Sequence, residues 1–389
     1  MGHHIGSKES IVPLIDRLNK YPVGLVDSDK LRQILSLLFD EREAYVASRF
    51  PLEEATLEEL SRRTRIDGAE LLAVLERMAD KGLVMDLPYS GTTYYMLMPG
   101  LIGFFEFTFM KNRTDLPLGK IARLMGEYMY ENPREGMAGE FFGSDTQLTR
   151  SLVYEDHIPV NSEVTTYESA REIIRQAGFG AVGMCYCRHK KEHLGEACRK
   201  DAPLEGICIS LGTAAKFMVR RGFAEEKSTE ELLAVLDRAR DQNLTHVTDN
   251  IRHKPSFVCN CCSCCCELLA GVQAGYIDGI AKTPYVAVID ADRCSGCGLC
   301  LKACNVEAIG LSEGQGRGRA MIDESVCLGC GACISGCNSE ALSLVERAER
   351  PVPPATRKEL FVRILKEKRR LTPYLVSGMK KKVRRMLSL

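Results

Sequence analysis

Two runs of four cysteines near the C-terminal end of the chain share the spacing Cys-x2-Cys-x2-Cys-x3-Cys. The first run is Cys294, Cys297, Cys300 and Cys304, and the second is Cys327, Cys330, Cys333 and Cys337. Three closely spaced thiolates can bind three iron corners of one cubane, whereas the fourth points away from it. The spacing therefore predicts two [4Fe–4S] clusters with crossed ligands. Cys337 completes the cluster of the first run, and Cys304 completes that of the second.

The residues between these cysteines agree with cluster binding. Four glycines allow the backbone to approach inorganic sulfide closely: Gly296, Gly298, Gly329 and Gly331. Short apolar runs predict strands at 285–290, 308–311, 320–323 and 341–344. Residues 284–346 thus resemble a bacterial two-cluster ferredoxin. One departure is that Asn305 and Asn338 stand where that family usually has proline, so we expect altered local rigidity or reduction potential. Zinc sites are the alternative, but they usually use two separated pairs of ligands.

Ten further cysteines precede these runs: Cys185, Cys187, Cys198, Cys208, Cys259, Cys261, Cys262, Cys264, Cys265 and Cys266. Thiolates at this density need a soft metal to share their charge, so we expect one or two more iron–sulfur clusters. Two cubanes would leave two thiols free, whereas two non-cubane clusters with five thiolates each would use all ten. With ten thiolates for two non-cubane clusters, the chain resembles the catalytic subunit of heterodisulfide reductases. The resemblance is in cysteine number only, because the regularly spaced Cys-Cys-Gly repeats of that family are absent here. A zinc site and reduced structural cysteines are the alternatives, and the division of the ten thiols stays open.

Basic residues border the central thiols: Arg188, His189, Lys190, Lys191, His193, Arg199 and Lys200. Such cations lower thiolate pKa values, raise cluster potentials and attract anionic partners. The alternative is a solvated basic loop. His189 and His193 share one helix face, but without a carboxylate at Glu-x-x-His spacing we expect surface residues rather than ligands. His246 could be either a surface residue or a metal ligand.

The N-terminal part of the chain carries the pattern of a winged helix-turn-helix. Apolar residues at helical spacing in 31–38 and 71–78, and the capping-box pair Thr56 and Glu59 between them, predict three helices. Apolar runs around a turn at 83–97 predict a hairpin after them. In the central segment, capping-box patterns starting at 165 and 228 predict two more helices, so we expect that segment to be mainly helical.

The charge is unevenly distributed along the chain. There are 52 Lys+Arg and 52 Asp+Glu in total, but residues 356–389 contain twelve basic and two acidic side chains. This tail could be a solvated extension, or two amphipathic helices that dock on an acidic partner or an anionic membrane surface. Residues 52–86 contain nine acidic and five basic side chains, which disfavours DNA binding. We expect a protein-docking or homo-oligomerising role for the winged-helix region.

The predicted fold class is α+β. The expected divisions are an N-terminal extension (1–26), a winged-helix-like domain (27–110), a connector (111–164), a mainly helical Cys-rich central domain (165–283), a two-cluster ferredoxin domain (284–346) and a basic tail (347–389). From the winged helix through both cysteine groups, the chain is similar to 4Fe–4S dicluster proteins of anaerobic prokaryotes. That resemblance implies that the protein works in an oxygen-poor cytoplasm, and it does not identify a substrate.

These observations favour a cytoplasmic iron–sulfur electron-transfer protein that serves a redox partner, either free or peripheral to the membrane. No secretory signal and no apolar run of about 18 residues are present, and the 18 cysteines therefore favour metal over disulfides. One alternative is an oxidoreductase that reduces a small disulfide-type substrate at the central cluster. Another is a redox-sensing DNA-binding regulator.

Overall fold

The computed structural model describes residues 7–132, 135–158, 166–312 and 318–372. The chain forms two compact units, one of residues 1–144 with 361–389 and one of residues 145–360. The division after Ser144 falls inside the range expected to be a connector. No helix among the described residues is long and apolar enough to cross a membrane.

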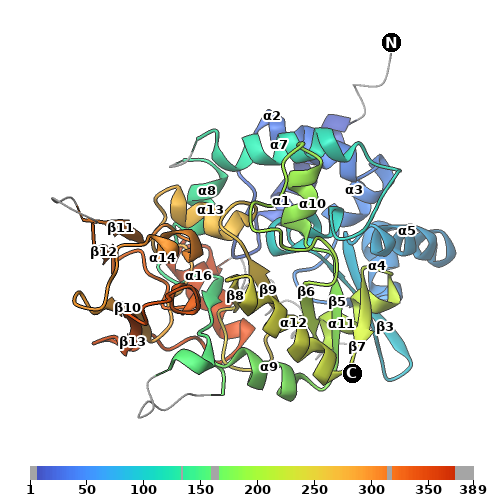
Figure 1. The fold of residues 1–389 in the computed structure, drawn as a ribbon. Helices are drawn as coiled ribbons and strands as arrows, with labels where there is room; N and C mark the ends of the chain where they lie inside the picture. The colour runs from blue at the N-terminus through green and yellow to red at the C-terminus, as the bar shows by residue number, and fades with distance from the viewer. Residues whose placement is uncertain (1–6, 133–134, 159–165, 313–317, 373–389) are drawn as a thin grey trace. The chain divides into compact units, whose positions relative to one another are not determined.

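The first unit starts with helices and a small sheet (Figure 1). Its elements are α1 (Ser7–Leu18), α2 (Asp29–Leu38), α3 (Glu41–Ser48), β1 (Ala55–Thr56), α4 (Leu57–Thr64), α5 (Gly68–Asp80), β2 (Val84–Tyr89) and β3 (Thr92–Leu97). The strand order is β1-β3-β2, with both pairs antiparallel. The capping box of Thr56 and Glu59 is confirmed at the start of α4. Gly82 has a φ of 74°, which lets the chain turn from α5 into the hairpin.

The rest of this unit is helical. It contains η1 (Gly100–Phe104), α6 (Phe105–Thr108), α7 (Leu118–Tyr130) and α8 (Met137–Phe142). The beginning of the basic tail also belongs to it: Lys368 and Arg370 pair with Glu140 at 2.9 and 2.6 Å. This part of the tail is therefore not a solvated extension. The apolar tail positions 374, 375 and 379 lie outside the described residues.

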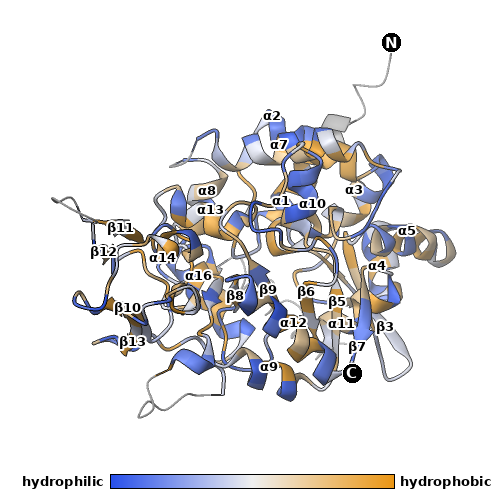
Figure 2. Ribbon diagram, viewed as in Figure 1, coloured by the Kyte–Doolittle hydropathy of each residue, from blue (hydrophilic) through white to orange (hydrophobic). Residues whose placement is uncertain are grey.

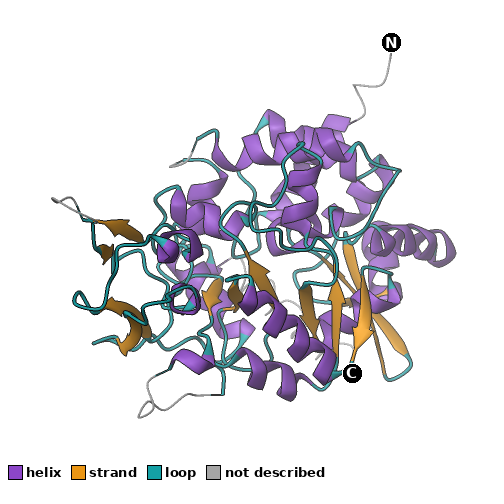
Figure 3. Cartoon of the chain, in the orientation of Figure 1, coloured by secondary structure: helices purple, strands orange, loops and turns teal. Residues whose placement is uncertain are grey.

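A six-stranded antiparallel sheet forms the centre of the second unit (Figure 3). Its strands, in spatial order, are β4 (Thr149–Ser151), β8 (Thr245–Asp249), β9 (Phe257–Cys261), β6 (Cys208–Leu211), β5 (Gly180–Gly183) and β7 (Ala224–Lys227). The expectation of a mainly helical central domain omitted this sheet, although helices still supply more of its described residues than strands do. Apart from the exposed edge strand β7, the strands are short and largely buried, so they lack the alternating polarity by which a half-exposed strand is recognised.

Helices connect these strands. They are η2 (Glu155–His157), α9 (Ala170–Ala177), α10 (Tyr186–Glu192), α11 (Gly212–Arg220), α12 (Thr229–Asp241) and α13 (Glu267–Gln273). The capping box of Ser228 and Glu231 is confirmed on α12, whose hydrophobic and hydrophilic residues alternate in Figure 2. The cap expected from Thr165 and Glu168 is wrong for α9, because Ser169 accepts the hydrogen bond from the Glu172 amide. Thr165 itself lies outside the described residues.

The last part of the second unit consists of short strands and helices. They are β10 (Tyr285–Ile289), α14 (Leu299–Ala303), β11 (Ile309–Leu311), β12 (Ala320–Ile322), α15 (Ala332–Ser335) and β13 (Leu342–Glu346). α16 (Arg357–Glu367) begins at the end of this unit, and its residues from Phe361 on belong to the first unit. β10 pairs with β13, and β11 with β12. All four predicted strands are thus confirmed to within two residues.

Candidate metal centres

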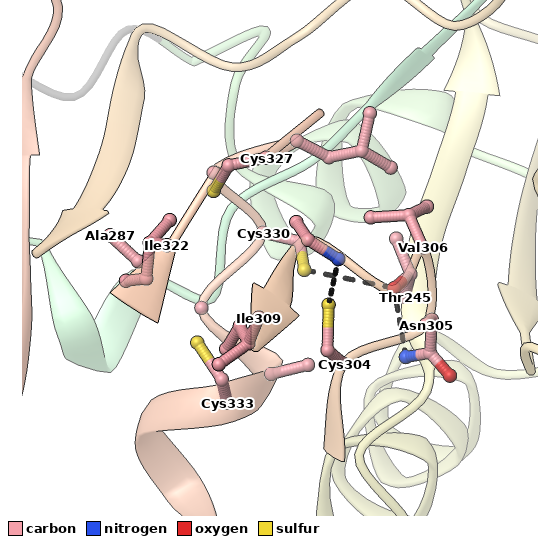
Figure 4. Close-up of a pocket in the computed structure, with 15 residues that line it drawn as sticks. Thr245, Ala287, Cys304, Asn305, Val306, Ile309, Ile322, Cys327, Cys330 and Cys333 are labelled. Carbon is pink, nitrogen blue, oxygen red and sulfur yellow. Dashed lines mark hydrogen bonds between the residues drawn. The ribbon is translucent and has the colours of Figure 1, made fainter. Parts of the chain in front are cut away.

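Four cysteines from both runs surround one cavity. Cys304, Cys327, Cys330 and Cys333 line this cavity (Figure 4). Burial raises the pKa of Cys304, Cys330 and Cys333, for Cys330 to about 11. Without a metal this apolar site would hold neutral thiols, whereas iron would supply the charge that stabilises thiolates. The cavity and the donor set therefore fit a cluster.

Three of the remaining cysteines of the two runs also approach one another. Cys337 interacts electrostatically with both Cys297 and Cys300. Cys297 is exposed, and the backbone amide of Leu299 lowers its pKa by hydrogen bonding. Cys294 is half-buried in the same loop. The structure thus brings the fourth cysteine of each run to the other run, and ligation of a cluster by these sets stays a prediction.

Asn305 joins the ferredoxin segment to the central sheet. Its side chain is 1% exposed. Its Nδ2 donates to the Asn243 carbonyl at 2.7 Å and to Thr245 Oγ1 at 3.0 Å, and its Oδ1 accepts from the Ser263 amide at 3.1 Å. The Thr245 hydroxyl in turn donates to Cys330 Sγ at 3.7 Å (Figure 4). A proline at 305 would lack all three side-chain bonds, which accounts for the departure from the ferredoxin pattern.

Six of the ten central cysteines form a chain of neighbouring thiols. The hydrogen-bonded pairs are Cys185 with Cys187, Cys187 with Cys266, Cys266 with Cys261, Cys261 with Cys259, and Cys259 with Cys208. They come from both ends of the connection between β5 and β6, from β9, and from the start of α13. β6 lies beside β9, which places Cys208 near Cys259. We call these the six-cysteine set.

The other four central cysteines form a compact group, which we call the four-cysteine set. The Sγ atoms of Cys198, Cys262, Cys264 and Cys265 all lie within 4.8 Å of one another. Cys198 lies in the loop before β6, and the other three lie in the turn between β9 and α13. Hydrogen bonds with the thiols of Cys262 and Cys265 lower the pKa of Cys198. The ten thiols are therefore divided into six and four.

The basic residues near these thiols are more buried than a solvated loop would be. Arg188, His189 and Lys190 are 5%, 4% and 2% exposed, so the alternative of a solvated basic loop is wrong for these three residues. Lys190 forms an ion pair with Glu267 at 2.5 Å. The expectation of a surface position is therefore wrong for His189, whereas His193 is exposed as expected. The Nε2 atoms of the two histidines lie 3.1 Å apart.

Two polar residues position these sites, and sequence reasoning missed one of them. Asn260, between Cys259 and Cys261, donates to the Ile207 carbonyl at 2.7 Å and bonds His246 Nδ1 at 2.7 Å. It holds β9 against both neighbouring segments. Lys200 donates to the Asn243 and Ala303 carbonyls at 3.3 and 3.1 Å. Nothing in the local sequence distinguishes Asn260 from an ordinary surface residue, whereas Lys200 is one of the basic residues that border the central thiols.

A comparison with known families supports the C-terminal site. Residues 293–341 match the model of a 4Fe-4S dicluster domain. No curated protein and no solved structure matches the chain. The match begins one residue before Cys294 and continues past Cys337, so it includes both cysteine runs. The chain therefore contains a ferredoxin-type domain that binds 4Fe–4S clusters.

Proposed function

We propose that this chain is an iron–sulfur electron-transfer protein. In this proposal two ferredoxin-type clusters accept electrons and pass them to further metal in the central segment. The observation that carries the proposal is the direct link through Asn305. Its bond to Ser263 connects the residue after Cys304 with the turn that holds Cys262 and Cys264. A short connection between two cysteine sites is what electron transfer between them requires.

Lys200 adds an electrostatic reason for the same proposal. Its ammonium group interacts with Cys262 and Cys264 of the central turn and with Cys304 and Cys330 of the ferredoxin segment. A positive charge next to two metal centres stabilises the reduced form of each, because reduction adds a negative charge. Lys200 would thus raise the potentials of both centres together.

The test is anaerobic iron and sulfide quantification followed by a redox titration with electron paramagnetic resonance detection. Two ferredoxin clusters account for about eight irons, and a further cubane would add about four. We expect more than eight irons and redox-active signals from the central segment. Cys330→Ser should remove one ferredoxin signal and slow reduction of the central signal. Equal reduction rates in the wild type and in Cys330→Ser would contradict a path through that cluster.

A reductase function is the second candidate, favoured by the size of the six-cysteine set. A cubane uses four thiolates, so six thiols leave two for other chemistry or hold a larger, non-cubane cluster. Reduction of a disulfide would consume two electrons, supplied through the ferredoxin clusters, and two protons, and it would release two thiols. Turnover of small disulfides with a reduced dye as electron donor tests this candidate. Loss of turnover in Cys208→Ser would support it, and no turnover in the wild type would reject it.

The partner proposals follow from charge. Residues 27–110 would act as a winged-helix-like docking or dimerising module, since their acidic surface disfavours nucleic acid. The basic end of the chain, which lies outside the described residues, would dock on an acidic redox partner or an anionic membrane. Salt-sensitive co-sedimentation with the partner or with anionic vesicles, lost after truncation at Pro354, tests docking. Light scattering at two protein concentrations tests dimerisation.

A further inference from the structure

We propose that the four-cysteine set binds one metal ion, Zn²⁺ or Fe²⁺, in a tetrahedral tetrathiolate site rather than an iron–sulfur cubane. This assignment goes beyond electron transfer through the ferredoxin clusters. With Fe²⁺ the site would be the acceptor beside the Asn305 link, and with Zn²⁺ the acceptor would be metal in the six-cysteine set. It also decides how the ten central thiols are used, because it leaves the six-cysteine set for any further cluster.

The distances between the sulfur atoms carry the inference. Cys198 Sγ lies 3.6 Å from Cys262 Sγ and 3.7 Å from Cys264 Sγ, and Cys264 Sγ lies 3.7 Å from Cys265 Sγ. A tetrahedron with metal–sulfur bonds of about 2.3 Å has edges of about 3.8 Å. The three separations therefore match the edges of a single-ion site.

The ferredoxin cysteines of the same chain provide an internal comparison. Four thiolates that each bind a different iron corner of a cubane lie farther apart than four thiolates that share one ion. Among the residues that the structure describes, neither predicted ferredoxin ligand set meets the 4.8 Å limit, whereas the four-cysteine set does. Cys304, Cys327, Cys330 and Cys333 instead surround a cavity. The chain thus holds two distinct sulfur geometries.

The surroundings of the four-cysteine set suit a bound dication. Four thiolates and a dication leave two negative charges. The backbone amide of Arg199 donates to Cys264 Sγ at 3.3 Å, and the amides of Lys200 and Ala202 donate to Cys198. The guanidinium of Arg188 is 5% exposed and hydrogen bonds with Cys198, and the Lys200 ammonium is the second nearby cation. These two positive charges balance the remaining negative charge.

Zinc and iron predict different roles for this ion. Tetrahedral coordination by four sulfurs is typical of both metals. Zn²⁺ has no redox chemistry, so it would fix the turn between β9 and α13 and thereby position Cys259, Cys261 and Cys266. Iron would add a one-electron centre beside the Asn305 link. The two cases share one geometry and differ in the element bound.

The experiment uses the full chain, purified anaerobically, and compares the wild type with Cys264→Ala, Cys198→Ala/Cys264→Ala and the control Cys330→Ser. Zinc, iron and acid-labile sulfide are quantified in each. We expect the double variant to lose one metal ion per chain with sulfide unchanged. Loss of zinc identifies the structural case, and loss of one iron identifies the redox case. The control should lose iron and sulfide together.

Loss of about four irons with about four sulfides in the double variant would overturn the proposal, and so would an unchanged metal content. X-ray absorption of the wild type gives an independent test that requires no variant to fold. At the zinc edge, where the irons of the ferredoxin clusters do not contribute, we expect four sulfur neighbours at about 2.3 Å in the structural case. Metal–metal scattering at the zinc edge would contradict a single-ion site. Retained ferredoxin signals in the double variant separate this result from a failure of the electron-transfer proposal.

Discussion

Replacement of Asn305 by alanine removes the side chain that connects the ferredoxin segment to the central turn. Three hydrogen bonds disappear, to the Asn243 carbonyl, to the Thr245 hydroxyl and from the Ser263 amide. Two of the partners keep another bond. Asn243 still accepts from Lys200, and Thr245 still donates to Cys330. The Ser263 amide loses its bond to Asn305, so the local effect falls on the turn with Cys262 and Cys264.

The expected loss of stability follows from the number of bonds. Each buried hydrogen bond contributes about 1 kcal/mol net, so Asn305→Ala should lower the free energy of unfolding by about 3 kcal/mol. For a domain of roughly 150–250 residues this lowers the unfolding temperature by about 6–12 °C. Opening of the central turn should also become easier by about 1 kcal/mol, which speeds amide exchange about fivefold.

Anaerobic calorimetry and hydrogen–deuterium exchange of the peptide containing Ser263 measure the two effects. Asn338→Ala is the matched control, because Asn338 occupies the same position after the second cysteine run but is exposed. It should change the free energy of unfolding by less than about 0.5 kcal/mol. Equal unfolding temperatures for the two variants, together with unchanged exchange at Ser263, would refute the reasoning. Both variants should keep their ferredoxin iron, because no cysteine is altered.

Three further predictions concern single sites. Gly329→Ala should reduce bound iron, because a Cβ there would lie 2.0 Å from the Tyr285 carbonyl oxygen. Gly298→Ala shares the left-handed backbone but has nothing within 4 Å of the added Cβ, so it should retain more iron than Gly329→Ala. Lys81→Met should lower the free energy of unfolding by about 3–5 kcal/mol, measured by denaturant titration, because it leaves the buried Glu43 carboxylate without its ion pair at 2.7 Å. Burial lowers the pKa of His246 to about 4. Acidification from about pH 6.5 to 4 should therefore destabilise the fold by up to about 3 kcal/mol, because the unfolded state takes up a proton that the folded state does not. His246→Gln should flatten that pH dependence, and parallel pH profiles of the unfolding temperature would count against it.

The elements that sequence predicted correctly are those specified by local signals. The capping boxes at Thr56 and Ser228 satisfy backbone amides within one helical turn, so neighbouring residues suffice to identify them. The ferredoxin strands flank and separate two cysteine runs of fixed spacing, which restricts where a strand can occur. In both cases a signal in the nearby sequence marks the element, even though β10 pairs with the distant β13.

The central sheet was not predicted because its short strands carry no local signal and several of them pair with distant segments. β6 lies beside β9, and β4 beside β8, and Cys208 comes near Cys259 only through the first of these pairs. The burial of Arg188 and Lys190 likewise depends on tertiary partners, namely the Asn260 carbonyl and Glu267. A run of basic residues is by itself typical of a solvated loop, so composition indicated the wrong environment.

The strand order β4-β8-β9-β6-β5-β7 also has a consequence for biosynthesis. Cys185, Cys187, Cys198 and Cys208 leave the ribosome before Cys259 and the five cysteines after it have been made. At 5–20 residues per second, the gap from Cys208 to Cys259 takes roughly 3–10 s. During that time the early thiols have no partner strand with which to enclose a metal. Metal insertion into either central set therefore has to follow synthesis of β9, and the early thiols stay exposed to oxidants and to unwanted metals until then.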